Sequence, residues 1–152
     1  MRISFDLDDT LICYEPEIPR EKCRVPFWAR LVGAPEPLRE GAVQLLRELI
    51  DSGHEIWIYT TSCREPKAVK RWLGFYGIPI QSVINAEVHA RAVPERMRRT
   101  ASKAPAAFGI ALHIDDEDSI SGDFELLTIS KSDENWADKV RETVRRLESA
   151  NY

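Results

Sequence analysis

The sequence predicts an α/β fold in which helices cover a mainly parallel sheet. Short segments rich in β-branched and aromatic residues alternate with segments whose apolar residues recur at helical spacing. Turns with glycine follow the helical segments, as at Asp51-Ser52-Gly53 and Gly77-Ile78-Pro79. Acidic or hydroxyl residues follow three of the strand-like segments directly. Because ligands of such sheets bind beyond the carboxyl ends of the strands, we expect a three-layer sandwich with a site at that edge.

The first half of the chain supplies two strands and two helices. Residues 3–5 are an apolar-biased start, typical of a short buried strand. Between residues 38 and 49 the apolar residues recur at near-helical spacing, which predicts a helix. Residues 55–62 are rich in β-branched and aromatic side chains and end in hydroxyls, as a buried parallel strand would. Residues 65–76 place Val69, Trp72, Leu73 and Tyr76 on one face, which predicts a crossover helix.

The second half continues the alternation. We expect a short third strand at 82–85, a short basic helix at 94–101, a fourth strand at 110–114, a fifth strand at 124–129 and a closing helix at 134–147. The inward face of the closing helix would carry Trp136, Val140, Val144 and Leu147. Since right-handed crossovers between parallel strands each need about a helix, the order predicts a Rossmann-like three-layer sandwich.

The size and charge of the chain exclude several classes of protein. At 152 residues we expect one domain, residues 1–152. Residues 12–37 contain five prolines, which predicts an irregular flap or small cap insertion. A net charge of -4 gives no general affinity for nucleic acid or anionic membranes. No apolar run approaches the roughly 20 residues of a membrane span, and residue 1 leads directly into the first strand, so we expect a cytoplasmic protein.

Cysteines and histidines show no metal-ligand spacing. They are Cys13, Cys23, Cys63, His54, His89 and His113. The cysteine count is odd and no Cys-x-x-Cys pair occurs, which argues against a disulfide framework and a ribbon-type zinc site. Reduced thiols are expected, and a zinc site assembled in space is the less favoured alternative.

The most informative segment is Asp6-Leu7-Asp8-Asp9-Thr10, at the end of the first strand. Carboxylates this close raise one another's pKa unless a cation or buried donors compensate, so the cluster predicts a bound metal or a tuned acid. Residues 60–62 and 115–116 are also polar and also follow predicted strands. The three segments would converge at one edge of the sheet.

Together these residues carry a family resemblance. The pattern is Asp6-x-Asp8-x-Thr10-Leu11 after the first strand, Thr60 ending the second, then Lys103, then Asp115-Asp116 ending a later strand. In order and spacing it resembles the four motifs of the haloacid dehalogenase-like (HAD) superfamily, which consists mostly of magnesium-dependent phosphatases. The resemblance runs from residue 3 to about residue 130.

The resemblance implies a role for each residue. Asp6 would attack phosphorus and form an aspartyl phosphate, and Asp8 would protonate the leaving oxygen and later activate water. Mg²⁺ would be held by Asp6, the backbone carbonyl of Asp8 and Asp116. Thr60 would donate a hydrogen bond to a phosphoryl oxygen, and Lys103 would stabilise the developing charge.

Several assignments keep alternatives. Substrate contacts are expected from Thr10, Thr60, Thr61 and Lys103, with Thr61 the second choice for the hydroxyl. Arg98, Arg99 and Lys67 are substitutes for Lys103. Asp115 is the second choice of metal ligand, and Glu117 and Asp118 are nearby alternatives. The residues Arg91, Arg96, Arg98 and Arg99 form an exposed basic helical face or steer a phosphorylated substrate.

A calcium loop is the main competing interpretation of the acidic cluster. Oxygen-bearing residues from Asp6 to Glu17 match the spacing of such a loop. However, Leu11 stands where that loop needs glycine, and five residues leave no space for its preceding helix. A surface cluster of acids without function is the other alternative, and the second acidic strand end at Asp115 argues against it.

The expected function is a Mg²⁺-dependent phosphomonoester hydrolase that acts through Asp6. The alternatives are a catalytically silent phosphate- or metal-binding module and a phosphotransferase of the same superfamily. The segment after the first motif, residues 12–37, and the segment between the second and third motifs, residues 62–102, are both short. We therefore expect a minimal cap and an open site. The substrate would be a phosphorylated small molecule or a macromolecular end, the partners would include no membrane, and the chain would be a monomer or homodimer.

Overall fold

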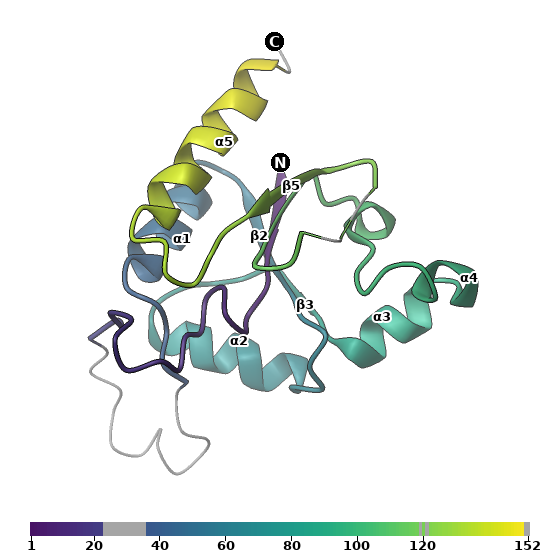
Figure 1. Ribbon diagram of the computed structural model, residues 1–152, viewed down its shortest axis with the longest axis horizontal. Coiled ribbons are helices and arrows are strands. Elements are labelled where there is room, and N and C mark those ends of the chain that lie inside the picture. The colour runs from purple at the N-terminus through teal and green to yellow at the C-terminus, as the bar shows by residue number, and fades with distance from the viewer. Residues whose placement is uncertain (23–35, 119, 121, 151–152) are drawn as a thin grey trace.

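The computed structural model describes residues 1–22, 36–118, 120 and 122–150 (Figure 1). The described strands are β1 (Arg2–Phe5), β2 (Glu55–Tyr59), β3 (Ser82–Ile84), β4 (Leu112–Asp115) and β5 (Glu125–Thr128). The described helices are α1 (Ala42–Asp51), α2 (Pro66–Phe75), α3 (Ala86–Ala92), α4 (Glu95–Arg98), α5 (Trp136–Ala150) and a 3₁₀ helix at Pro105–Phe108. These strands form one sheet in the order β3-β2-β1-β4-β5, and every pairing is parallel. The predicted α/β, Rossmann-like class is confirmed.

The register of the sheet brings the polar strand ends together. β1 is central, with β2 on one side and β4 on the other. Phe5 pairs with Ile58 of β2 and with Ile114 of β4. Because all three strands run the same way, the residues that follow them lie at one edge of the sheet.

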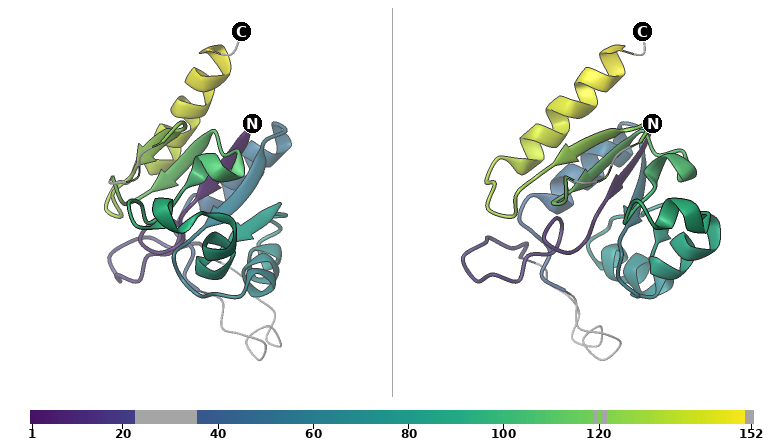
Figure 2. Two further views of the ribbon diagram at one scale, coloured as in Figure 1. Left: turned by 90° about the vertical axis from the view of Figure 1, so that its right-hand side faces the viewer. Right: turned by 45° about the vertical axis from the view of Figure 1, so that its right-hand side comes forward.

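Side chains alternate between the two faces of the sheet. On one face, Ile3 and Phe5 of β1 belong to a core shared with α1, α2 and α5. On the other face, Tyr59 packs with Ile84 and Ile110 beneath α3 and the 3₁₀ helix. Figures 1 and 2 show α1 and α5 on the opposite side of the sheet from α3 and α4. The two helical layers are therefore distinct, and the second layer is the smaller.

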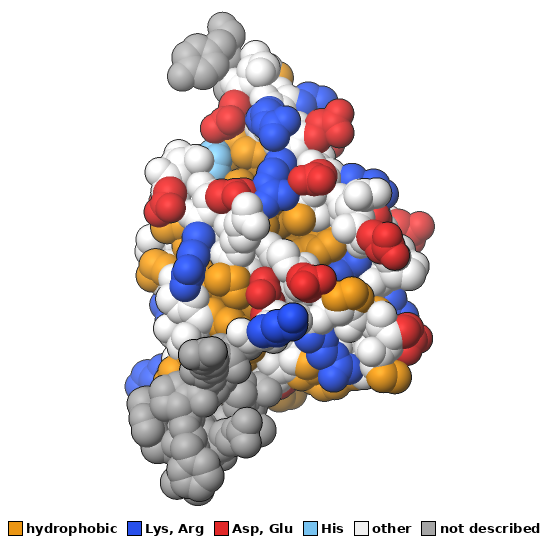
Figure 3. Space-filling model, turned by 90° about the vertical axis from the view of Figure 1, so that its left-hand side faces the viewer, with side chains coloured by type: hydrophobic (Ala, Val, Ile, Leu, Met, Phe, Trp, Pro, Cys, Tyr) orange, Lys and Arg blue, Asp and Glu red, His pale blue; other side chains and the backbone are white. Residues whose placement is uncertain are grey.

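The outer surface of α1 and α5 is charged with both signs (Figure 3). Arg141 of α5 donates to Glu48 of α1 at 2.7 Å and also pairs with Asp138. An exposed surface of interspersed charges needs no partner to explain it.

Some helices begin or end at other residues than predicted, because the local backbone conformation sets their bounds. The first helix begins at Ala42 instead of Leu38, because Gly41 is left-handed at φ 85° and Leu38 pairs with Ile12 as an isolated bridge. α3 has no counterpart among the predicted elements. It begins where the Asn85 side chain accepts the Val88 N–H at 2.9 Å. The basic helix expected at 94–101 is the single turn of α4.

Part of the predicted flap or cap insertion at 12–37 lies outside the described residues. Cys23, Phe27 and Trp28 belong to that part, so the nature of the insertion stays a prediction, as does the single domain. Cys13 and Cys63 are free thiols, as expected. Within the described ranges, none of the helices has the length and apolar character needed to cross a membrane.

Candidate active site at the carboxyl edge of the sheet

The turn after β1 fixes the first acidic cluster. Asp6 is almost fully buried, and its backbone N–H donates to the Ile114 carbonyl at 2.9 Å. The N–H groups of Leu11 and Ile12 both donate to the Leu7 carbonyl, at 3.0 and 2.7 Å. Asp9 has a φ of 58°, a conformation that aspartate tolerates better than most residues. The tight turn therefore anchors Asp6 against the end of β4.

A buried lysine joins the two acidic strand ends. Lys103 Nζ lies 2.7 Å from Asp6 Oδ1 and 2.5 Å from Asp115 Oδ2, and its side chain is 3% exposed. Burial raises the pKa of Asp6 to about 6 although Lys103 opposes the shift. An ammonium between two buried carboxylates offsets a desolvation cost of several kcal/mol per ion. Lys103 thus touches the predicted nucleophile, as the sequence led us to expect, and it comes from the segment before the 3₁₀ helix.

Asp115 is surrounded by hydrogen-bond donors. Its Oδ2 accepts from Lys103 and from His113 Nε2 at 2.8 Å, and its Oδ1 accepts the Glu117 N–H at 3.0 Å. Burial favours the neutral acid, but the bonds from His113 and Lys103 outweigh it and lower the pKa of Asp115 to about 2. The Ser4 hydroxyl donates to His113 Nδ1 at 2.7 Å, which leaves the ring hydrogen on Nε2. Asp115 is therefore a fixed carboxylate with most of its acceptor sites already used.

Asp6, Asp115 and Asp116 form a group that could hold a cation. One carboxylate oxygen from each lies within 4.8 Å of the others. Asp116 is the exposed member, and burial together with the Asp115 charge raises its pKa. Carboxylate oxygens are preferred ligands of hard cations such as Mg²⁺ and Ca²⁺, so the donor set fits the predicted metal. No histidine or cysteine belongs to this group within the described residues.

Asp8 is held by an arginine that the sequence analysis did not single out. Arg64 donates to both Asp8 oxygens at 2.7 Å and to both Glu36 oxygens at 2.8 Å. The hydrogen bonds that Arg64 donates to Glu36 and Asp8 raise the pKa of its guanidinium. Asn85 Nδ2 donates to the Arg64 carbonyl at 3.0 Å, which ties this segment to the start of α3. Both Asp8 oxygens therefore accept a hydrogen bond from Arg64.

The hydroxyl residues differ in their surroundings. Thr60 is buried at the end of β2, where it donates to Ser62 Oγ and accepts the Ser62 N–H, both at 3.1 Å. Thr61 is exposed beside it. Thr10 is fully buried, and its Oγ1 has no hydrogen-bond partner among the described residues. The substrate contacts of all three threonines stay predictions.

The substitutes for Lys103 lie elsewhere. Arg99 pairs with Glu95 on the surface, Lys67 is exposed on α2, and Arg98 lines a separate cavity. Glu117 and Asp118, the alternatives to Asp116, are exposed.

Three neighbours of the site, Ser4, His113 and Arg64, were missed by the sequence analysis. A period of two places His113 on the same face of β4 as Asp115, so the strand pattern carried that information. Arg64 lies beyond the strand end, where no periodicity applies.

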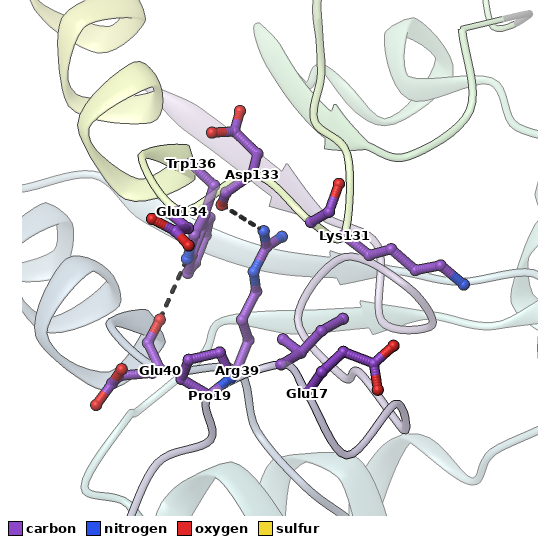
Figure 4. Close-up of a pocket in the computed structure, with 10 residues that line it drawn as sticks. Glu17, Pro19, Arg39, Glu40, Lys131, Asp133, Glu134 and Trp136 are labelled. Carbon is purple, nitrogen blue, oxygen red and sulfur yellow. Dashed lines mark hydrogen bonds between the residues drawn. The ribbon is translucent and has the colours of Figure 1, made fainter.

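Another cavity, of about 450 Å³, has none of the aspartates Asp6, Asp8, Asp115 and Asp116 in its wall (Figure 4). Its wall includes Arg39, whose guanidinium donates to the Asp133 carbonyl at 2.6 Å and stacks over the Trp136 ring at 5.0 Å. Trp136 Nε1 in turn donates to the Glu40 carbonyl at 3.2 Å. Because the polar groups of Arg39 and Trp136 are satisfied within the protein, this cavity gives less indication of chemistry than the carboxyl edge.

No protein-family model and no curated protein sequence matches the chain. The function is therefore inferred from the chemistry of the site.

Proposed function

We propose that this chain is a minimally capped, HAD-like phosphatase that hydrolyses phosphomonoesters through an aspartyl phosphate on Asp6. The observation that carries the proposal is the Lys103 ammonium between Asp6 and Asp115. A carboxylate that attacks a phosphate must approach a group of the same charge. A buried cation in contact with that carboxylate reduces the repulsion and stabilises the charge that develops on the phosphoryl oxygens.

The chemistry divides between two carboxylates. In the first step Asp6 forms a bond to phosphorus, the ester bond breaks, and the leaving oxygen takes a proton from Asp8. In the second step water attacks the aspartyl phosphate, Asp8 accepts the proton from water, and phosphate leaves with Asp6 restored. Thr60, at the end of the strand next to β1, would turn its hydroxyl from Ser62 and donate a hydrogen bond to the phosphoryl group.

Asp6, Asp116 and the Asp8 carbonyl would hold Mg²⁺. A bound Mg²⁺ supplies positive charge that orients the phosphoryl group and offsets its repulsion from the carboxylates. Asp116 is preferred over Asp115 because Asp115 already accepts three hydrogen bonds, whereas Asp116 is exposed. Asp115 would then hold Lys103 in place.

The test is turnover of a chromogenic aryl phosphate in the presence of Mg²⁺. Asp6→Asn should lower kcat by about 10³-fold or more, because the amide is a poor nucleophile. Asp51→Asn, the same change at an exposed residue of α1, should leave kcat unchanged. Acid-quenched wild type should carry a phosphoryl group on the peptide that contains Asp6. Equal activity of wild type and Asp6→Asn would disprove the mechanism.

The bidentate contact between Arg64 and Asp8 favours a second candidate, a phosphate-binding module without turnover. If Arg64 never releases Asp8, the leaving oxygen receives no proton and alkyl phosphates remain intact. Mg²⁺-dependent binding of beryllofluoride without hydrolysis of any phosphate in a broad panel would support this candidate. Turnover of an alkyl phosphate would exclude it.

A further inference from the structure

A second cavity, of about 290 Å³, lies beside Thr60. Its wall is formed by the end of β2, by α3 and by the segment around Arg98 and Ser102. Thr60 belongs both to this wall and to the edge of the sheet that holds Asp6. Through Thr60, the cavity therefore adjoins the edge of the sheet that holds Asp6.

His89 presents a hydrogen-bond donor to this cavity. The Tyr59 hydroxyl accepts the Ala104 N–H at 2.8 Å, so its own hydrogen is directed to the other partner within reach, His89 Nδ1. Burial raises the pKa of Tyr59 to about 12, which keeps that hydrogen in place at neutral pH. The ring hydrogen of His89 is consequently on Nε2, an atom with no hydrogen-bond partner among the described residues.

Arg98 adds an uncompensated positive charge. Two neighbouring arginines are neutralised by glutamates one turn away, Arg91 by Glu87 and Arg99 by Glu95. Arg98 has no such ion pair within the described part of the chain. It lies close enough to His89 that, together with burial, it lowers the pKa of that imidazole.

The remaining wall favours an anion of small size. None of the described residues that line the cavity is acidic, and the Thr61 hydroxyl contributes a further polar group. The Ser102 hydroxyl, also in the wall, donates to Glu117 at 3.1 Å. A volume of 290 Å³ is at the lower limit of small-molecule sites, which span about 300–1,000 Å³. The cavity has room for a few carbon atoms and one charged group.

We propose that this cavity binds a second anionic group, a carboxylate or a phosphate, at the far end of a small phosphomonoester substrate. The inference rests on the proposed phosphatase function, because it takes Asp6 as the position of the first phosphoryl group. It assigns Arg98 and His89 to recognition of the leaving group. A small doubly anionic metabolite then replaces the macromolecular end as the expected substrate class.

Binding of non-hydrolysable phosphonates tests the cavity independently of catalysis. Calorimetric titration of the full chain with Mg²⁺ at low ionic strength would compare propylphosphonate, 3-phosphonopropanoate and propane-1,3-bisphosphonate. A charge-assisted contact to the second anion should make at least one of the last two bind about tenfold more tightly than propylphosphonate. The two doubly anionic ligands distinguish a carboxylate from a phosphate. Equal affinity for all three phosphonates would overturn the proposal.

Variants of Arg98 test whether this residue causes the tighter binding of the doubly anionic phosphonates. Arg98→Gln should remove it, Arg98→Lys should retain most of it, and Arg96→Gln, on the same short helix but outside the cavity wall, should not change it. Arg98 is exposed, so these changes leave the core intact. A preference that persists in Arg98→Gln would also overturn the proposal.

Hydrolysis of propyl phosphate, measured in parallel, separates the two proposals. Turnover without a preference among the phosphonates contradicts the cavity assignment and leaves the phosphatase intact. A preference lost in Arg98→Gln without any turnover supports the cavity and contradicts the phosphatase.

Discussion

At the scale of single residues, the site depends on how three carboxylates are kept apart and oriented. Asp115 is held by His113, and His113 is held by Ser4, its register partner in β1. Because Lys103 binds the same Asp115 oxygen as His113, rotation of Asp115 would break the contacts of that oxygen with both residues. His113 is therefore a positioning residue that acts through Asp115.

Replacing His113 should lower kcat and Mg²⁺ activation while Asp6, Asp115 and Asp116 remain grouped. His113→Phe removes the Nε2 donor, and we expect a loss of about 10–100-fold in kcat together with weaker Mg²⁺ activation, as for residues that orient metal ligands elsewhere. His113→Gln should recover part of the loss, because its amide can still donate to Asp115. The measurement is kcat as a function of Mg²⁺ concentration. Thermal unfolding of each variant controls for stability, and unchanged kcat and Mg²⁺ dependence in folded His113→Phe would contradict the role.

Replacing Arg64 should lower kcat/KM most for substrates whose leaving group needs a proton. Alkoxide leaving groups require the Asp8 proton, whereas a nitrophenolate departs without one. Since Arg64 orients Asp8, Arg64→Gln should lower kcat/KM for an alkyl phosphate about tenfold more than for nitrophenyl phosphate. Arg91→Gln, which breaks only a surface pair, is the control. If Arg64→Gln hydrolyses the alkyl phosphate faster than wild type, the Arg64 contact is inhibitory.

The residues that the sequence could reveal were those tied to a strand end. Asp6, Thr60 and Asp115 follow periodic apolar segments, so their convergence was predictable from topology alone. Lys103 was found only through the order of the motifs, since an isolated lysine carries no pattern. Arg64 and Glu36 come from irregular segments that approach each other only in the folded chain, and no local rule predicts such a contact.

At the scale of elements, Arg39 links the segments around the first turn to the end of the sheet. Its guanidinium donates to the carbonyls of Thr10, Ser130 and Asp133 and stacks on Trp136 of α5. The apolar spacing of residues 38–49 predicted that Arg39 lies in a helix. It instead lies in the extended stretch before Gly41, where it donates to the Thr10 carbonyl and adds a second donor to the carbonyls of Ser130 and Asp133.

Arg39→Met should destabilise the fold. The change removes charge-assisted hydrogen bonds to one buried and two partly buried carbonyls, each worth about 1.5–3 kcal/mol, and we expect the free energy of unfolding to fall by about 2–4 kcal/mol. Urea denaturation provides the measurement. Arg145→Met, at an exposed position of α5, should change the free energy by no more than about 0.5 kcal/mol. A similar small change in Arg39→Met would show that backbone carbonyls near Arg39 find other donors.

The described helix α3 was not predicted, because its apolar residues show only weak helical periodicity. α3 has only seven residues, most of them small or polar, and its start depends on the Asn85 cap. The longer helices were found because apolar stripes marked them, as in α5, where Trp136, Val140 and Val144 are buried as predicted. Local capping and left-handed glycines set boundaries that hydrophobic patterns do not encode.

At the scale of the whole molecule, the stability of the fold depends on pH through two buried groups, His54 and Asp6. His54, just before β2, is buried and lies 3.4 Å from Glu148 near the end of α5. Burial lowers the pKa of His54 from 6.5, and Glu148 only partly opposes that effect. Asp6 has the opposite behaviour, since burial raises its pKa from 3.8 to about 6.

The two shifts act on stability in opposite directions. As the pH falls through 6.5, the unfolded chain protonates His54 before the folded chain does, so the stability present above 6.5 is lost. Asp6 takes up its proton first in the folded chain, which adds stability as the pH falls from about 6 toward 3.8. The histidine effect therefore begins at higher pH than the aspartate effect.

His54→Gln isolates the first of these effects. Between about pH 7.5 and about pH 5.5, the Tm of His54→Gln should fall less than the Tm of wild type, because glutamine binds no proton in either state. The contribution of Asp6 is common to both proteins and cancels in the difference. Thermal unfolding at several pH values, with a chelator present to exclude divalent metals, measures this difference. Parallel Tm curves for the two proteins would mean that His54 titrates alike in the folded and unfolded chains, in contradiction to its burial between β2 and α5.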